Sequence, residues 1–193
     1  MAAAFLGEAD KVQFRPLTAP ERFTALRSGE IDLLSRNTTQ NLSRDSVGGN
    51  GVSFGPVVFH DGQALMVKKG SGFNSLSDLS GEAICVGSGT TTEQNLNDAF
   101  EARKLPYTPI KYQDLNQVVG GYAQGRCAAM TSDRSQLAAA RSGLPDPEQH
   151  VILDDRLSKE PLAPAVVGGD QSMADAMRWV VYALIEAEER GIT

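Results

Sequence analysis

Three short stretches of the chain carry polar side chains in patterns that suit the binding of a small ion. The first, GSGTTTEQ at 87–94, follows an apolar strand-like segment and leads into a helical pattern. A glycine-rich turn that opens into a helix presents backbone N–H groups at the positive end of the helix dipole, and such turns commonly hold an anion. The first question is therefore which anion this turn suits.

The residues of this turn exclude two nucleotide-binding motifs. A P-loop needs a lysine after its glycines, and a dinucleotide-binding loop needs a third glycine where this chain has Thr92. Glycines beside helix N–H groups and threonine hydroxyls suit a small anion such as a carboxylate. The alternative is an ordinary helix start, in which Thr90 and Glu93 form a capping box.

The second stretch, RNTTQNLSR at 36–44, spaces two arginines among hydroxyl and amide side chains. Guanidinium groups bind carboxylates through two parallel hydrogen bonds, so this pattern favours a carboxylate site, although a solvated loop has the same composition. The third stretch, TSDR at 131–134, follows a strand-like segment, and ligands of open α/β sheets lie at such strand ends. Asp133 there either binds an ammonium group or caps the next helix. If Thr91 binds a carboxylate group, Thr91 and Asp133 together provide a partner for each charged group of an α-amino acid.

Composition and motifs argue against several other functions. The net charge is −6 and no basic run is longer than Lys68–Lys69, which argues against nucleic-acid binding. No G-x-S-x-G or H-E-x-x-H motif is present, and His60 and His150 lack metal-ligand spacing, so we expect neither an enzyme nor a metal or cofactor site. The N-terminus lacks the positive region of a secretory signal, and no segment has the length and hydrophobicity of a membrane span.

The two cysteines leave two interpretations open at this point. Cys85 and Cys127 are either two buried thiols, as is usual in the cytosol, or a disulfide formed in an oxidising compartment.

The middle of the chain alternates between strand-like and helix-like segments. The predicted strands are 82–87, 107–112, 126–132 and 150–155, and the predicted helices between them are 90–104, 115–125 and 133–143. This order predicts a parallel sheet with helices on both faces.

The flanking segments predict a second, smaller lobe. Strands are expected at 12–18 and 31–35, helices at 19–30 and 171–191, and a short helix at 75–81. The extended segments 56–70 and 160–170 are candidate crossings between lobes. We therefore expect lobe 1 to comprise 1–58 and 166–193, and lobe 2 to comprise 59–165 with both crossings.

These pieces, in this order, resemble the type II periplasmic solute-binding proteins of ABC importers, and most closely the general L-amino-acid-binding branch. The resemblance spans nearly the whole chain and is carried by the segments LTAPERFTALRSGEIDLLSRNTTQNLSRD, HDGQALMVKK, ICVGSGTTTEQNL, GRCAAMTSDRSQLAA and SKEPLAPAV. It implies an α/β fold of the periplasmic-binding-protein type II, in which one complete doubly wound lobe is inserted in an incomplete first lobe. It also implies a periplasmic protein that delivers an L-amino acid to a membrane ABC permease.

The resemblance assigns roles to individual residues. Arg44 matches the arginine that holds the ligand α-carboxylate, and Thr91 adds a hydroxyl and an N–H to the same group. Asp133 matches the ammonium partner, with Asn37 and Thr39 as neighbouring polar contacts, the former through its backbone carbonyl. The remaining assignments are Arg36, which tunes the side chains accepted, and a disulfide between Cys85 and Cys127.

The chain also departs from the pattern of this family. The family's opening strand and helix in lobe 1 have no counterpart, and the chain stops soon after its last predicted helix, so we expect a chain truncated at both ends. An incomplete lobe exposes sheet edges and core faces, which favours self-association. The alternatives to a binding protein are a truncated fragment that binds nothing and a dehydratase-like enzyme on the same fold, for which only Asp133 is a candidate catalytic carboxylate.

Overall fold

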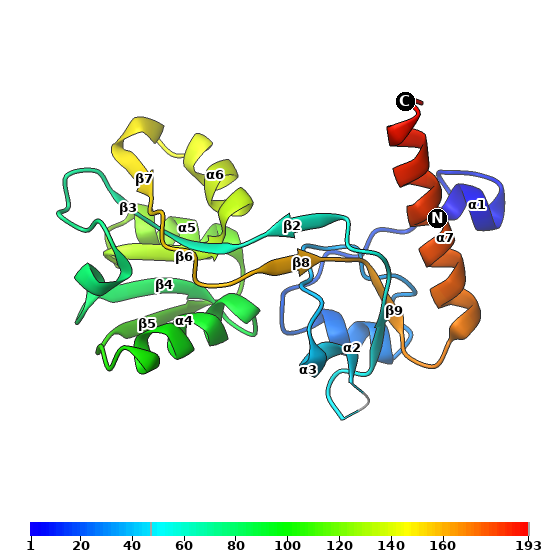
Figure 1. The fold of residues 1–193 in the computed structure, drawn as a ribbon, viewed down its shortest axis with the longest axis horizontal. Helices are drawn as coiled ribbons and strands as arrows, with labels where there is room; N and C mark the ends of the chain where they lie inside the picture. The colour runs from blue at the N-terminus through cyan, green and yellow to red at the C-terminus, as the bar shows by residue number, and fades with distance from the viewer. Residues whose placement is uncertain (47, 193) are drawn as a thin grey trace. The chain divides into compact units, whose positions relative to one another are not determined.

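A computed structural model describes residues 1–46 and 48–192, and the chain divides into two compact units (Figure 1). Unit 1 comprises Met1–Leu17, Glu21–His60 and Pro161–Thr193, and unit 2 comprises Thr18–Pro20 and Asp61–Glu160. The chain passes between the units in strands β2 (Phe59–Asp61) and β8 (Glu160–Leu162), which pair with each other. The units thus divide at 60/61 and 160/161, whereas the sequence placed the lobe boundaries at 58/59 and 165/166.

Unit 2 is built on a five-stranded sheet with the order β5-β4-β6-β3-β7. Its strands are β3 (Gln63–Lys68), β4 (Ala83–Gly87), β5 (Thr108–Tyr112), β6 (Ala129–Asp133) and β7 (His150–Ile152). Strand β4 runs parallel to β5 and β6, whereas β3 is antiparallel to both β6 and β7. The four strands that the sequence predicted for this sheet, β4, β5, β6 and β7, therefore run in one direction, as expected, and β3, which the sequence placed in a crossing between lobes, is an additional antiparallel strand. This strand enters the sheet from β2 after the single residue Gly62 and lies between β6 and β7.

Helices cover both faces of this sheet, as the sequence predicted. Because successive strand residues point to opposite faces, Leu65 packs with α4 (Thr91–Ala102) and η1 (Leu76–Leu79) on one side. Met66 packs on the other side with residues of α5 (Leu115–Ala123) and α6 (Arg134–Ser142), and η2 (Pro147–Gln149) precedes β7. Unit 2 is therefore a three-layer doubly wound lobe.

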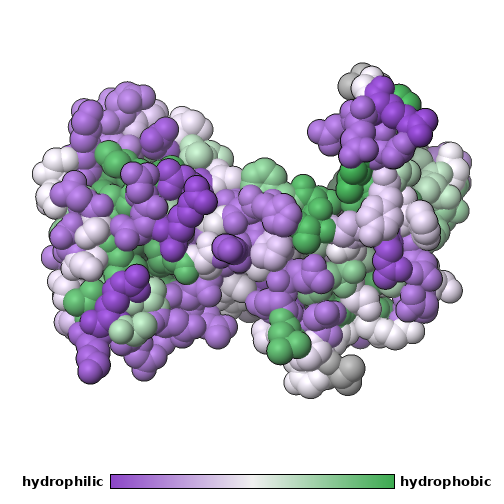
Figure 2. Space-filling model, in the orientation of Figure 1, coloured by the Kyte–Doolittle hydropathy of each residue, from purple (hydrophilic) through white to green (hydrophobic). Residues whose placement is uncertain are grey.

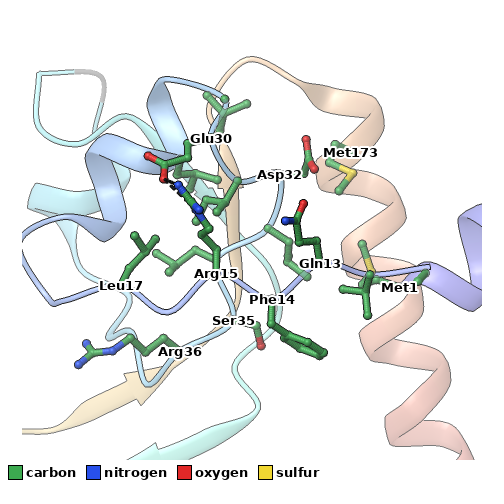
Figure 3. Close-up of a pocket in the computed structure, with 18 of the residues that line it drawn as sticks. Met1, Gln13, Phe14, Arg15, Leu17, Glu30, Asp32, Ser35, Arg36 and Met173 are labelled. Atoms are coloured by element: carbon green, nitrogen blue, oxygen red, sulfur yellow. Dashed lines mark hydrogen bonds and ion pairs between the residues drawn. The ribbon is translucent and has the colours of Figure 1, made fainter. Parts of the chain in front are cut away.

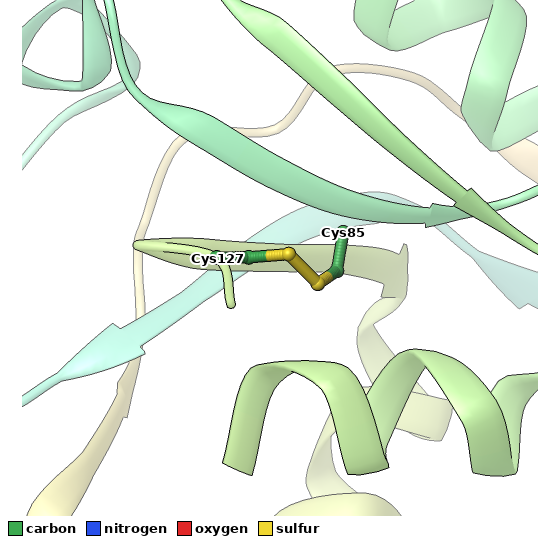
Figure 4. Close-up of a disulfide and its surroundings, with 2 residues drawn as sticks. All are labelled: Cys85 and Cys127. Carbon is green, nitrogen blue, oxygen red and sulfur yellow. A yellow bond between two sulfur atoms is a disulfide. The ribbon is translucent and has the colours of Figure 1, made fainter. Parts of the chain in front are cut away.

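A disulfide links β4 to the chain just before its neighbour β6, on one face of the unit 2 sheet (Figure 4). Cys85 lies in β4 and Cys127 lies just before β6, and their Cα atoms are 5.7 Å apart. Both side chains belong to the buried cluster on the α5 side of the sheet. The predicted pairing of Cys85 with Cys127 is confirmed.

Unit 1 contains little sheet and both ends of the chain (Figure 1). Strand β1 (Val52–Phe54) pairs antiparallel with β9 (Ala165–Val167), and the helices are α1 (Ala2–Leu6), α2 (Arg22–Arg27), α3 (Leu42–Asp45) and α7 (Gln171–Glu189). The predicted strand at 12–18 was wrong, because these residues, which include Pro16, have no partner strand. The predicted strand at 31–35 is reduced to one bridge between Leu34 and Ala165.

Unit 1 leaves many large apolar side chains at its surface. Phe14 is 84% exposed, and on α7 Trp179 is 68% and Leu184 is 65% exposed. Hydrophobic residues also reach the surface on the visible face of the molecule in Figure 2, where they lie among hydrophilic ones. Within the described residues, no helix combines the length and hydrophobicity needed to cross a membrane.

Candidate functional site

The segment from Arg36 to Arg44 is fixed in unit 1 by backbone hydrogen bonds to the returning chain. Leu34 exchanges two hydrogen bonds with Ala165, Thr38 O accepts from Ala163, and Gln40 N donates to Pro161 O. Because of these bonds the segment is ordered and is not a solvated loop. Thr39 is buried within it, while Arg36 and Asn37 are partly exposed.

Arg44 is buried at 5% exposure in the short helix α3, whose first residues are capped by Asn41. Its Nη1 donates to the backbone carbonyl of Thr39 at 2.8 Å, and its guanidinium lies 5.3 Å from the centre of the Phe23 ring. A planar guanidinium held by a hydrogen bond and an aromatic face is well suited to two-pronged recognition of a carboxylate.

A second buried arginine, which the sequence did not single out, lies on the same aromatic ring. Arg22 is 2% exposed, and its guanidinium lies 4.9 Å from the centre of the Phe23 ring. Its Nη1 lies 3.3 Å from Thr38 Oγ1 and 3.5 Å from the carbonyl of Asn37. That carbonyl is the atom predicted to bind the ligand amine. Two guanidinium groups therefore lie against the Phe23 ring in unit 1.

Unit 1 also holds a groove of about 1040 Å³, but this groove is a poor candidate for an amino-acid site (Figure 3). Its walls come from residues 11–17, from 29–36 and from the start of α7, and they include the ion pair Arg15–Glu30 at 2.6 Å. Of the predicted ligand-binding residues only Arg36 lines it. A smaller hollow of about 310 Å³ in unit 2, near Asn95 and Asp155, contains none of them.

The glycine-rich turn of unit 2 caps the start of α4. Thr90 Oγ1 accepts from Glu93 N at 3.0 Å, and the Glu93 carboxylate accepts from Gly89 N at 2.8 Å. Thr90 therefore caps the helix as expected, but the predicted capping box is only half formed, because the Glu93 carboxylate accepts from Gly89 N and not from Thr90 N. The first N–H groups of any α-helix have no acceptor within the helix by its geometry, so the cap and an anion site are compatible.

Asp133 lies at the carboxyl end of β6, close to this helix start. It is 4% exposed, and although it occupies the N-cap position of α6 its side chain makes no cap hydrogen bond. The register places it opposite Gln63, whose Nε2 donates to Thr92 O and to Thr131 Oγ1, both at 2.9 Å. Gln63 thus links the strand end that bears Asp133 to the first turn of α4.

Two buried polar residues of unit 2 were missed by the sequence analysis. Gln63 is fully buried and its Oε1 has no partner among the described residues. Glu160 is 2% exposed, and its carboxylate accepts from Thr91 Oγ1 at 3.0 Å and from Asn95 Nδ2 at 2.8 Å. Neither lies in a recognisable motif; the only signal was a polar residue in QALMV and in SKEPLAP, two segments otherwise expected to be extended.

The described residues contain no group of three or more histidine, cysteine, aspartate or glutamate side chains that could hold a metal ion. The polar groups gathered at the end of the unit 2 sheet can be compared with an organic ion on their own chemistry. Helix N–H groups suit a carboxylate, and the Asp133 carboxylate suits an ammonium group.

No family model matches the chain, but individual proteins do. The general L-amino acid-binding periplasmic protein AapJ of Rhizobium johnstonii is 50% identical over 193 residues, which are 100% of this chain and 56% of that protein. The glutamate/glutamine/aspartate/asparagine-binding protein BztA of Rhodobacter capsulatus is 47% identical with the same coverage. The chain thus spans about half the length of the curated relatives it matches.

Solved structures of binding proteins have a fold similar to that of this chain. A periplasmic binding protein from Brucella ovis with glutathione bound matches with a TM-score of 0.91 and 46% identity, covering 100% of this chain and 60% of that chain. An ancestral arginine-binding protein bound to arginine matches with a TM-score of 0.82 and 28% identity, covering 98% of this chain and 79% of that chain. These relatives are named for binding and not for catalysis, in agreement with the prediction that the chain is not an enzyme.

Proposed function

Because this chain is a homologue of the amino-acid-binding proteins of ABC importers, with the fold of type II periplasmic binding proteins, we propose that it binds a small L-amino acid for delivery to such an importer. The periplasm is the proposed location, since AapJ is named a periplasmic protein. The ABC permease is the proposed partner, since a further relative, YhdW of Escherichia coli, is named a putative amino-acid ABC transporter-binding protein.

The observation that carries the proposal is the arrangement at the end of the unit 2 sheet. The first turn of α4 and the buried carboxylate of Asp133 are joined through Gln63, which contacts Thr92 O and pairs with Asp133. This end of unit 2 therefore carries a partner for each charged group of an α-amino acid. In the proposal Arg44 of unit 1 is a second carboxylate partner, and Arg36, Asn37 and Thr39 are further polar contacts.

A thermal-shift screen of the chain against L-glutamate, L-glutamine and L-arginine tests the proposal. A ligand that binds only the folded protein raises its melting temperature by mass action. We expect at least one of these amino acids to raise it. No shift with these or the other common L-amino acids, for a chain that is folded, would reject the proposal.

Two substitutions test the residue assignments in the same assay. Arg44→Ala and Asp133→Asn each remove a charged partner, so each should abolish the shift. Arg141→Ala at the end of α6 and Asp154→Asn, whose side chain is exposed, are matched controls that should retain it. A full shift in either site variant would mean that the site is misplaced.

The second candidate is a portion of a longer protein that does not bind a ligand by itself. It is favoured by the coverage of only 56% of the curated relatives and by the large groove and exposed apolar residues of unit 1. It predicts a folded chain that gives no thermal shift with any amino acid. The same screen therefore separates the two candidates.

A further inference from the structure

We propose that Glu160 is a positioning residue that fixes the Thr91 hydroxyl as a hydrogen-bond acceptor toward the ligand, so that this hydroxyl recognises the ammonium group. The inference rests on the proposed function, because it assigns roles within the same amino-acid site. It changes the role of one predicted residue. The family resemblance assigned the ligand carboxylate as the partner of the Thr91 hydroxyl, whereas the hydrogen bonds of unit 2 favour the ammonium group.

Glu160 contacts the beginning of α4 through two hydrogen bonds within unit 2, and a third links it to Ser158. Its Oε2 accepts from Thr91 Oγ1 at 3.0 Å, and its Oε1 accepts from Asn95 Nδ2 at 2.8 Å and from the Ser158 hydroxyl. Thr91 and Asn95 are four residues apart and so lie on one face of the helix. A single buried carboxylate at the start of β8 therefore fixes the orientation of the first helical turn.

These bonds determine where the Thr91 proton points. A hydroxyl has one proton and two acceptor lone pairs, whereas an ionised carboxylate can only accept. Since the hydroxyl donates to Glu160, Thr91 Oγ1 can only accept from any further partner. A ligand carboxylate has no proton to give, but an ammonium group has three. The ligand carboxylate is then left to the N–H groups of the first turn of α4.

The surroundings of Thr91 favour a cationic partner for its hydroxyl. Asp133, the predicted ammonium partner, is opposite Gln63, and the Gln63 amide reaches the carbonyl of Thr92, next to Thr91. The orientation of that amide is fixed, because Thr92 O can only accept and must face Nε2. The other end of this amide, the buried Oε1 atom, is an acceptor without a partner among the described residues.

The test compares an amino acid with the same molecule lacking its ammonium group. We would measure the affinity of the 193-residue chain for L-glutamate and for glutarate by calorimetry, or for L-glutamine and glutaramate where glutamine is the better ligand. The variants are Thr91→Val, which removes the hydroxyl at nearly constant shape, Glu160→Gln, and the double variant. Glu148→Gln, at an exposed carboxylate in η2, is the matched control.

Glu160→Gln should reverse the direction of the hydrogen bond between residue 160 and the Thr91 hydroxyl. Two donors, from Asn95 and Ser158, face Oε1, so the new amide nitrogen should take the Oε2 position and donate to Thr91 Oγ1. The hydroxyl proton would then point toward the ligand. We expect Glu160→Gln and Thr91→Val each to weaken L-glutamate binding about tenfold, with a change for glutarate of about twofold or less. In the Thr91→Val background, Glu160→Gln should add little.

If Glu160→Gln lowered the affinities for L-glutamate and for glutarate equally, Glu160 would have a merely structural role and the inference would be overturned. Where Glu160→Gln does not fold, Thr91→Val alone tests whether the Thr91 hydroxyl accepts from the ligand. If Thr91→Val loses glutarate binding but retains L-glutamate binding, the inference is contradicted. A double-mutant cycle on thermal stability without ligand separates the two proposals. Zero coupling between Thr91 and Glu160 with normal L-glutamate binding rejects this inference alone, whereas an unaltered chain that binds no amino acid rejects both.

Discussion

His150 and Tyr122 form a polar pair that links the stability of unit 2 to pH. The Tyr122 hydroxyl lies 2.8 Å from His150 Nδ1, and burial raises the pKa of Tyr122, which therefore keeps its proton and donates to the neutral imidazole. Burial lowers the pKa of His150, and the positive charge of Lys68, its partner on β3, lowers it further, against the opposing effects of Asp146 and a hydrogen bond to Pro145. The folded protein therefore favours neutral His150.

The sign of the pH dependence follows from this lowered pKa. Unfolded His150 titrates near its ordinary value of about 6.5 and so binds a proton more tightly than the folded protein does. We expect its contribution to the free energy of unfolding to be present above that value and to be lost as the pH falls through 6.5 toward the lowered folded pKa. Urea unfolding at a series of pH values measures it. His150→Gln should flatten this part of the profile; an unchanged slope in this variant contradicts the prediction.

At the scale of single residues, motifs in the sequence pointed to only part of the candidate site. Thr91 and Asp133 were found because a glycine-rich helix start and a polar strand end are recognisable locally. Gln63, Glu160 and Arg22 were missed, because a buried polar residue is defined by its partners in space. Glu160, for example, contacts Thr91 across a sequence separation of 69 residues.

At the scale of elements, local patterns predicted the helices of unit 2 within a few residues of their bounds. Helix α4 was expected at 90–104 and spans Thr91–Ala102, since its cap and its apolar residues Leu96 and Phe100 are readable locally. The direction of β3 was not predictable, because strand residues encode which face is buried but not which neighbour pairs. The strand expected at 12–18 was wrong for a related reason: a strand requires a partner.

The cap of α4 provides a prediction at this scale. Thr90 Oγ1 accepts from Glu93 N at 3.0 Å and its hydroxyl donates to Gly87 O at 2.7 Å. Thr90→Ala leaves the N–H of Glu93 without its cap and should lower the free energy of unfolding by about 1 kcal/mol. Thr90→Ser keeps the hydroxyl and is the control. Denaturant unfolding of both variants measures the effect, and equal losses would show that the cap is not the cause.

The disulfide provides a second prediction for the strands of unit 2. Cys85 and Cys127 are 42 residues apart in sequence, and a cross-link of this span stabilises a domain by about 4 kcal/mol, mainly by restricting the unfolded chain. Replacing both residues by alanine should lower the free energy of unfolding of unit 2 by a comparable amount. Adding a reductant should have a similar effect on the unaltered chain but none on the double variant. A double variant as stable as the oxidised protein would contradict this prediction.

At the scale of the whole molecule, the exposed apolar residues of unit 1 underlie the prediction of self-association. Trp179 and Leu184 on α7 and Phe14 near the N-terminus are each more than half exposed, and apolar surface of this kind favours contacts between proteins. We expect the mass in solution, measured by light scattering, to rise with protein concentration. Leu184→Glu should reduce the rise, whereas Val151→Glu, at an exposed residue of β7 in unit 2, should not. A monomer at every concentration would contradict the prediction.

The central claim is that this chain binds an L-amino acid, with Asp133 as the partner of the ammonium group. Isothermal titration calorimetry of the folded chain with L-glutamate and with L-glutamine tests it most directly. We expect saturable binding of at least one of them, weakened about tenfold or more by Asp133→Asn, because a charged hydrogen bond in a buried site is lost. Saturable binding that Asp133→Asn leaves unchanged, or no binding of any common L-amino acid, would contradict it.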